Sequence, residues 1–185
     1  MNIFNKDSTF NLANLVTFLN ISVGVLAIYF INKHDFFTAI ILAWLSGILD
    51  ILDGKLARKY NLSTEFGVQI DSFSDFISFV IMPSFLLFYA LSEKFTSIAQ
   101  EIIIGLVFIT YIILGLKRLV QFNIKAVAGE VNDSFEGVPV PLGAIFFWIF
   151  YLIFSYGIID NVYTIGMLVL IVASTLNSKL KIPHP

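Results

Sequence analysis

The chain has 185 residues; 58% of them are hydrophobic and only 13% are charged, and the mean hydropathy is +0.89. A soluble domain of this length needs far more charge to cover its surface, so this composition argues against a soluble globular protein and indicates a membrane protein. The formal net charge of −2 argues against a nucleic-acid partner, and the absence of cysteine excludes disulfides and thiolate metal sites.

Apolar stretches long enough to cross a membrane, which takes about 20 mostly apolar residues, recur along the chain. In order they are Leu12–Ile31, a stretch from Phe36 into the charged segment Asp50–Arg58, Phe66–Leu91, Ile98–Phe122, Pro141–Tyr156 and Val162–Leu176. No repeat or linker divides them. We therefore expect an all-α, polytopic membrane protein: one membrane domain over residues 1–185, built as a six-transmembrane-helix bundle.

The basic residues predict how these helices are oriented. If the N-terminus is cytoplasmic, only Lys33 and Lys94 fall on the outer side. The nine on the cytoplasmic side are Lys6, Lys55, Arg58, Lys59, Lys117, Arg118, Lys125, Lys179 and Lys181. Because cytoplasmic loops carry an excess of Lys and Arg, we expect a multi-pass protein of the cell membrane with both termini in the cytoplasm.

Four aspartates lie near the predicted cytoplasmic ends of the second and third helices, where ionisable groups are costly and point to function. At 100° per residue, two of them and two small residues fall within roughly a 100° arc of the second helix: Asp50, Asp53, Gly54 and Ala57. In the third, Gly67, Asp71 and Asp75 recur every four residues. The short loop between these helices makes them antiparallel neighbours, so the acidic faces can converge.

Carboxylates gathered in a low-dielectric setting repel one another strongly. Each can take up a proton, or the group can bind cations; hard divalent ions suit an all-oxygen site, which favours Mg²⁺ or Mn²⁺. Two such ions balance four negative charges, and a pair about 3.5–4 Å apart is a known arrangement for phosphoryl-type displacement. Since acidic residues within a membrane also line ion pathways, a cation transporter is the alternative from another class.

The segment from Asp50 to Asp75 reads D-x2-D-G-x2-A-R-x8-G-x3-D-x3-D. This pattern resembles the signature of the CDP-alcohol phosphotransferase family, six-helix membrane enzymes, often homodimers, that exchange the CMP of a CDP-lipid or CDP-alcohol for a hydroxyl acceptor. The resemblance implies that Asp50, Asp53 and Asp71 are metal ligands. It implies that Asp75 completes the metal site and serves as the general base. The asymmetry of the basic residues predicts that this active site lies on the cytoplasmic side.

The same resemblance assigns the CDP pocket to Gly54, Ala57, Arg58 and Gly67. The small residues leave room for a nucleotide, and the arginine can hold a phosphate through two hydrogen bonds or anchor a helix end at the interface. Thr17 and Asn20 of the first helix either face the nucleotide or form hydrogen bonds between helices.

Three further segments resemble the phosphatidylserine synthase branch of the family: Arg118–Asn123, Phe135–Pro141 and Ser178–His184. They imply L-serine as the acceptor and CDP-diacylglycerol or the ether lipid CDP-archaeol as the donor. Arg118 can pair with the serine carboxylate and Asn123 can accept from its ammonium, although Lys117 and Arg118 also fit as topology residues.

Two points stay open at this stage. Glycerol 3-phosphate or inositol phosphate is the alternative acceptor, with Lys117, Arg118 and Lys125 facing its phosphate. Gly137, Pro139 and Pro141 fit a rigid helix entrance better than ligands, because proline suits the first helical turn.

Overall fold

The computed structural model describes residues 3–6, 8–127, 134–178 and 181–183. These fall into two compact units, Met1–Ser78 and Phe79–Pro185. The boundary lies inside a helical stretch rather than in a linker, and the expectation of a single domain stays a prediction.

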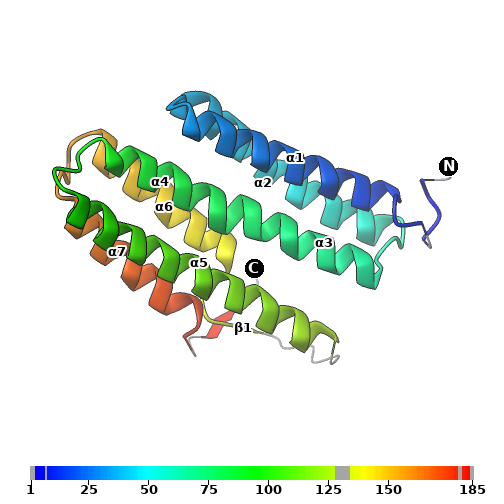
Figure 1. Cartoon of the computed structure of the whole chain (residues 1–185). Coiled ribbons are helices and arrows are strands. Elements are labelled where there is room, and N and C mark those ends of the chain that lie inside the picture. The colour runs from blue at the N-terminus through cyan, green and yellow to red at the C-terminus, as the bar shows by residue number, and fades with distance from the viewer. Residues whose placement is uncertain (1–2, 7, 128–133, 179–180, 184–185) are drawn as a thin grey trace. The chain divides into compact units, whose positions relative to one another are not determined.

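Three helices build the first unit: α1 (Leu12–Asn32), α2 (Phe36–Lys59) and α3 (Glu65–Asp75). α1 and α2 run antiparallel along their whole length, and α3 packs mainly against α1 (Figure 1). Each helix begins where a side-chain oxygen accepts a backbone N–H of the first turn, which satisfies a donor that has no partner within the helix. These caps are Asn11, Asp35 and Thr64.

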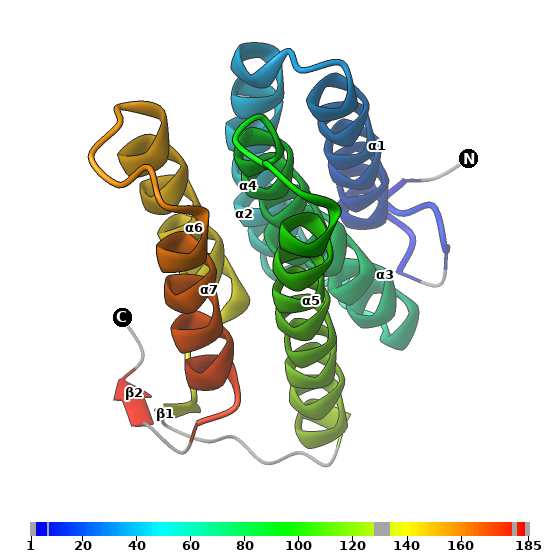
Figure 2. The ribbon, with the colours of Figure 1, turned by 60° about the vertical axis from the view of Figure 1, so that its left-hand side comes forward.

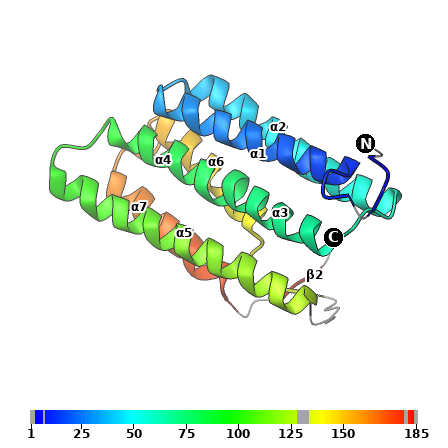
Figure 3. The ribbon, with the colours of Figure 1, turned by 45° about the vertical axis from the view of Figure 1, so that its right-hand side comes forward.

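The N-terminal segment is folded onto this unit, beside the start of α1 and the end of α2 (Figure 3). The Asn11 side chain donates to the Leu62 carbonyl in the loop after α2, with an N–O distance of 3.3 Å. The Phe4 and Tyr60 ring centroids lie 5.3 Å apart. These contacts hold the loop between α2 and α3 against the start of α1.

A buried polar cluster joins the helices of the first unit in mid-span. The Ser46 hydroxyl of α2 bonds to the Asn20 amide oxygen of α1, and the Ser46 and Ser78 oxygens lie 2.7 Å apart. Ser78 belongs to η1 (Phe76–Ile81), a π-helical segment that follows α3. Asn20 thus forms hydrogen bonds between helices, which is the second of the two roles that the sequence left open. Buried polar contacts of this kind help to fix how membrane helices pack.

The second unit contains α4 (Met82–Ser92), α5 (Ile98–Val127), α6 (Val140–Ser155) and α7 (Val162–Leu176). α7 packs against α5 and α6 (Figure 2), and α4 packs against α6. The Tyr111 and Phe147 rings, with centroids 4.3 Å apart, form its centre. Pro139 occupies the position just before α6 and Pro141 lies in its first turn, which confirms the expected helix entrance.

Two short strands, which the sequence did not suggest, complete this unit. β1 (Ser134–Glu136) pairs antiparallel with β2 (Lys181–Pro183), with Phe135 opposite Ile182. Two of the segments that resemble the serine branch are thereby joined. Lys179 and His184 of that tail pattern lie outside the described residues.

The predominantly helical architecture is confirmed, and four helical stretches are long and apolar enough to cross a membrane: Leu12–Asn32, Phe36–Lys59, Glu65–Ser92 and Ile98–Ile124. The apolar helices α6 and α7, with 16 and 15 residues, are shorter. Large apolar side chains stay exposed along α2, including Trp44 at 68%. Such a surface is costly in water and fits contact with lipid.

Gly24 allows the helices of the first unit to approach closely. A Cβ at this position would lie 2.9 Å from the Ile77 Cγ2 atom and 3.3 Å from the Ser78 hydroxyl. At Gly105 of α5, the nearest atom outside the helix backbone would be 3.9 Å away. Gly24 is therefore a packing position, whereas Gly105 has room for a methyl group.

We expect Gly24→Ala to lower the thermal unfolding midpoint of the detergent-solubilised protein, and Gly105→Ala to leave it unchanged or raise it. Overpacking costs about 1–3 kcal/mol, against which the better helix propensity of alanine returns about 1 kcal/mol. Equal midpoints for the two variants would contradict the close approach at Gly24.

Candidate metal and nucleotide site

Three carboxylates converge in the first unit, as the sequence predicts. Asp50 and Asp53 come from α2 and Asp71 from α3, and one oxygen of each lies within 4.8 Å of the others. Asp53 is buried, with 4% of its surface exposed, while Asp50 and Asp71 are partly exposed. The spacing of three residues within α2 and the packing of α2 and α3 on α1 produce this arrangement.

The fourth aspartate, Asp75, lies beside this three-carboxylate group. Its side chain lies within hydrogen-bonding reach of Asp50, one turn of α3 beyond Asp71. It is the last residue of α3 before the π-helical segment η1. Asp75 thus adjoins the group without being one of its three converging members.

The carboxylate group fits a divalent cation. Hard cations such as Mg²⁺ take carboxylate oxygens, and like charges at this separation are stabilised when a cation lies among them. The Oδ2 atom of Asp53 is buried and accepts no hydrogen bond from the described residues, so it is available as a ligand. Asp50, Asp53 and Asp71 would hold such an ion.

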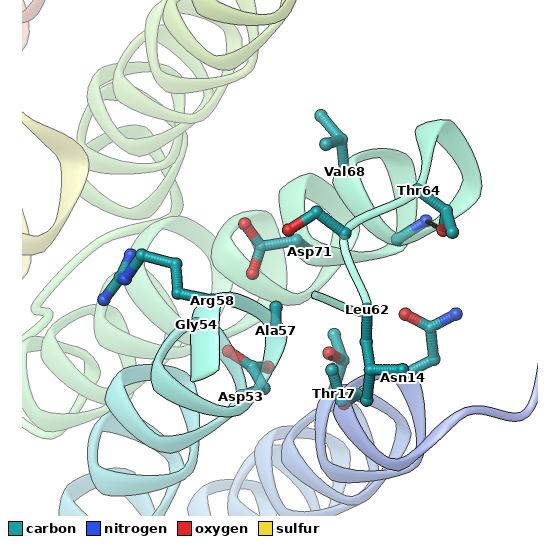
Figure 4. Close-up of a pocket in the computed structure, with 13 residues that line it drawn as sticks. Asn14, Thr17, Asp53, Gly54, Ala57, Arg58, Leu62, Thr64, Val68 and Asp71 are labelled. Carbon is teal, nitrogen blue, oxygen red and sulfur yellow. Dashed lines mark hydrogen bonds between the residues drawn. The ribbon is translucent and has the colours of Figure 1, made fainter. Parts of the chain in front are cut away.

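Beside the carboxylates, the first unit contains an open pocket with a volume of about 250 Å³ (Figure 4). Its walls come from α1, α2, α3 and the loop between α2 and α3. The lining residues are Ala13, Asn14, Thr17, Asp53, Gly54, Ala57, Arg58, Leu62, Ser63, Thr64, Gly67, Val68 and Asp71.

The structure brings most of the residues predicted for the CDP pocket to this cavity. Gly54, Ala57, Arg58, Gly67 and Thr17 all line it, whereas Asn20 lies in the polar cluster described above. The Arg58 guanidinium lies against Gly54, 3.7 Å from where a Cβ would be. Thr17 lies beside Asp53 and also donates to the Ala13 carbonyl.

Sequence reasoning missed Asn14 and the loop residues Leu62, Ser63 and Thr64. A signal for Asn14 was present, because polar residues recur every three positions from Asn11 through Asn14 and Thr17 to Asn20, so that Asn14 and Thr17 are neighbours on the surface of α1. The loop residues carry no comparable pattern. Their part in the cavity depends on how the loop folds against α1.

The residues predicted to bind serine lie in the second unit. The Arg118 Nη2 atom donates to the Gly137 carbonyl at 3.2 Å, and Asn123 is partly exposed further along α5. Gly137 has a φ of +79°. The backbone N–H of the next residue, Val138, donates to the Thr175 carbonyl. Arg118 therefore belongs to a folded junction between α5, α6 and α7. The Lys125 side chain lies outside the described residues.

Comparison with known proteins decides the family. The sequence model of the CDP-alcohol phosphatidyltransferases matches residues 10–176, which is most of the chain. The chain belongs to this family. The match covers all four aspartates and both compact units, so the resemblance carried by the aspartate pattern is confirmed.

Several relatives within the family have been named. A CDP-diacylglycerol–serine O-phosphatidyltransferase of Helicobacter pylori is 33% identical over 132 residues, which are 71% of this chain and 53% of that protein. One of Bacillus subtilis is 32% identical over 92% of this chain and 88% of that protein. An archaetidylserine synthase of Methanothermobacter thermautotrophicus is 34% identical over 76% of this chain and 58% of that protein. The chain thus spans little more than half the length of two of these three relatives.

Two glycines with positive φ differ in their surroundings, which allows a matched test of the junction at Arg118. A Cβ on Gly137 would lie 2.5 Å from the Leu176 carbonyl oxygen and 3.0 Å from that of Ser178. On Gly157, with a φ of +68°, the nearest atom to a Cβ would be the Asp160 Oδ1 atom, a side-chain oxygen 3.9 Å away.

We expect both Gly137→Ala and Gly157→Ala to lower the thermal unfolding midpoint. Each alanine loses about 1–2 kcal/mol of folding stability because it must adopt a left-handed backbone conformation. Only Gly137→Ala also forces a methyl group against backbone oxygens. The additional loss is about 1–3 kcal/mol. Equal shifts in the two variants would mean that the junction is looser than described.

Proposed function

We propose that this protein transfers a phosphatidyl or archaetidyl group from a CDP-linked lipid to L-serine and releases CMP. The observation that carries the proposal is the group of three converging aspartates at a cavity lined by the family's small residues and Arg58. The names of the relatives support serine as the acceptor, and they include both an ester-lipid and an ether-lipid synthase.

In this proposal the cofactor is two divalent ions, Mg²⁺ or Mn²⁺. Asp50, Asp53 and Asp71, with Asp75 completing the site, would hold the ions, whose positive charge would offset that of the diphosphate and of the departing CMP. The donor set supports this assignment because all of its ligand atoms are carboxylate oxygens.

The reaction joins the serine hydroxyl oxygen to the lipid-side phosphorus and breaks the bond from that phosphorus to the oxygen of CMP. Asp75 accepts the hydroxyl proton, because it adjoins the three-carboxylate group without being one of its members. Arg58 binds a phosphate of the donor with its planar fork of N–H groups. Gly54, Ala57 and Gly67 leave the space that the nucleotide occupies, with Thr17 beside Asp53.

The proposal also extends to the membrane arrangement. Six crossings require that the shorter helices α6 and α7 also span the bilayer, and the excess of Lys and Arg in alternate connections supports cytoplasmic termini and a cytoplasmic active site. Membrane lipid then surrounds the exposed apolar faces. A homodimer stays a prediction that rests on the family resemblance.

Two substitutions distinguish a metal ligand from the general base. We expect Asp53→Asn to weaken Mn²⁺ binding and nearly abolish turnover, because it removes a charged ligand. Asp75→Asn is expected to bind Mn²⁺ with near-normal affinity and to turn over about 10²–10⁴-fold more slowly, which is the usual contribution of a general base. Mn²⁺ binding is followed by titration calorimetry and turnover by CMP release.

Asp160→Asn is the control, because this exposed aspartate lies in the second unit, where its Oδ1 atom lies 3.8 Å from the Lys94 Nζ atom. Full activity in excess EDTA would refute the metal site. Loss of Mn²⁺ binding in Asp75→Asn would make Asp75 chiefly a ligand.

The acceptor is tested with the purified chain, CDP-diacylglycerol or CDP-archaeol, and a panel of alcohols. We expect CMP release with L-serine, poor release with serinol, which lacks the carboxylate, and little with glycerol 3-phosphate or inositol phosphate. If a phosphate-bearing acceptor works and serine does not, the protein belongs to another branch of the family. If no CDP-lipid is consumed while ions are moved across vesicles, the transporter alternative holds.

The same assay tests the proposal that Arg118 binds the serine carboxylate and Asn123 its ammonium. A lysine cannot reproduce the two-bond contact of a guanidinium with a carboxylate. Arg118→Lys should therefore raise the KM for L-serine by roughly 10- to 150-fold, which corresponds to about 1.5–3 kcal/mol for a charge-assisted bond. An effect on the CDP-lipid alone would assign Arg118 elsewhere.

A further inference from the structure

The face of α2 that points away from the carboxylates carries a stripe of exposed apolar side chains. Measured from Asp53 at 100° per residue, the stripe lies roughly 160–240° around the helix, on the far side from the metal site. Because α2 is long and apolar enough to cross a membrane, this stripe is a surface for lipid acyl chains. Its members recur every three or four residues: Phe37, Ile41, Trp44, Ile48 and Ile51.

Two lysines continue the stripe beyond its apolar part. Lys55 and Lys59 fall at about 200° and 240° on the same scale, one turn apart, and both side chains are exposed. Arg58, by contrast, lines the pocket beside the carboxylates. Along this face, α2 therefore presents apolar side chains and then two positive charges, which is the order that matches the acyl chains and the phosphate of a phospholipid.

Within the described part of the chain, the charges of these two lysines are not balanced by acids. No acidic residue lies three or four positions from either lysine in α2, and no ion pair joins them to another described residue. Like charges one turn apart destabilise a helix. The negative end of the helix dipole acts only within the last turn, and Lys55 lies before that turn. An anion between the two ammonium groups would remove the repulsion.

Tyr60 holds one of these charges in place. The Lys59 Nζ atom lies 5.3 Å from the centroid of the Tyr60 ring, and the Phe4 ring packs against the same tyrosine. An aromatic ring fixes an ammonium group without cancelling its charge and leaves N–H donors available to another partner. Tyrosine and lysine are also typical of the depth at which a helix passes the lipid headgroups. The Lys59 ammonium is thus positioned to meet a headgroup.

We propose that Lys55 and Lys59 bind the phosphate of an anionic phospholipid whose acyl chains lie along the apolar stripe of α2. The phosphate accepts hydrogen bonds from both ammonium groups, and its charge offsets theirs. A zwitterionic lipid such as phosphatidylcholine fits less well, because its choline brings a further cation to the two lysines. The site lies on the opposite side of α2 from the aspartates and is separate from the proposed reaction.

Charge also favours a lipid over a second copy of the chain as the occupant of this face. Two copies that are oriented alike in one membrane and related by a two-fold axis would present the same lysines at the same depth. Contact through this face would gather four ammonium groups, which like-charge repulsion opposes. An anionic lipid supplies the negative charge that a second copy lacks here.

Trp44 reports which lipid lies on the stripe. Its side chain is 68% exposed, and it lies about three turns before Lys55, roughly 16 Å along the helix axis and so at the depth of acyl chains. Bromine atoms on an acyl chain quench a tryptophan that they contact. The full-length chain is reconstituted in vesicles of phosphatidylcholine and phosphatidylglycerol in varied ratios, with one of the two lipids brominated in each series. Trp44→Phe records the contribution of Trp148, and subtraction leaves that of Trp44.

We expect Trp44 to prefer phosphatidylglycerol by roughly 5- to 30-fold in relative binding constant, since one basic residue near an anionic lipid contributes about 5-fold. Lys55→Gln and Lys59→Gln should each lower this preference about 2- to 5-fold, and the double variant should abolish it. Replacing both lysines by arginine keeps the charges and should keep the preference. Lys33→Gln is the matched control, because Lys33 also lies over a ring, that of Tyr29 at 5.8 Å, but beside the other end of α2.

Equal contact of both lipids with Trp44 in the wild type would overturn the proposal, as would a preference that survives in the double glutamine variant. Absence of quenching by either lipid would also overturn it and would indicate that protein covers the stripe. Displacement of the brominated phosphatidylglycerol by millimolar inorganic phosphate would show a site for a free anion and contradict a lipid site. No substrate is present, so failure of the proposed reaction leaves this measurement valid.

Discussion

The repulsion between like charges gathered at the aspartate group is the constraint on which the first unit depends. Three carboxylates with oxygens within 4.8 Å of one another, and a fourth beside them, cannot be brought together in a low-dielectric setting without structure that holds them there. The helices that carry them must therefore be fixed in register. A cation bound among the carboxylates would offset this repulsion.

α1 provides much of that fixation although it carries none of the aspartates. Asn11 holds the loop between α2 and α3, and Asn20 bonds to Ser46, which lies one turn before Asp50 on α2. Ser78 bonds into the same cluster from η1, just after Asp75. Hydrogen bonds between helices are thus placed on both sides of the carboxylates along the unit. In a membrane, where burial of apolar surface does not drive helix association, such contacts are an effective means of setting register.

The second requirement of the site is space for a ligand, and residues with small side chains on the helices provide it. Gly54 lines the cavity with room beside it, since the nearest atom to a Cβ there would be the Arg58 Nη1 atom, 3.7 Å away. Gly67 also lines the cavity, but a Cβ there would lie 2.9 Å from the Asn14 Oδ1 atom, so this glycine, like Gly24, permits a close approach between helices. Only the neighbours of a glycine distinguish a packing position from one that leaves room for a ligand.

The sequence by itself determined what depends on local pattern. The length of the apolar stretches predicted α7 over Val162–Leu176 and the bounds of α6 to within one residue. The spacing of the aspartates predicted that Asp50, Asp53 and Asp71 converge, because helical periodicity places such residues on one face of each helix. Tertiary structure alone decided the role of Asn20, the orientation of Asn14, the π-helical segment η1 and the pairing of β1 with β2. Each of these depends on hydrogen bonds between residues that are distant in the chain or on a departure from regular helical geometry, and a pattern of neighbouring residues carries no information about such partners.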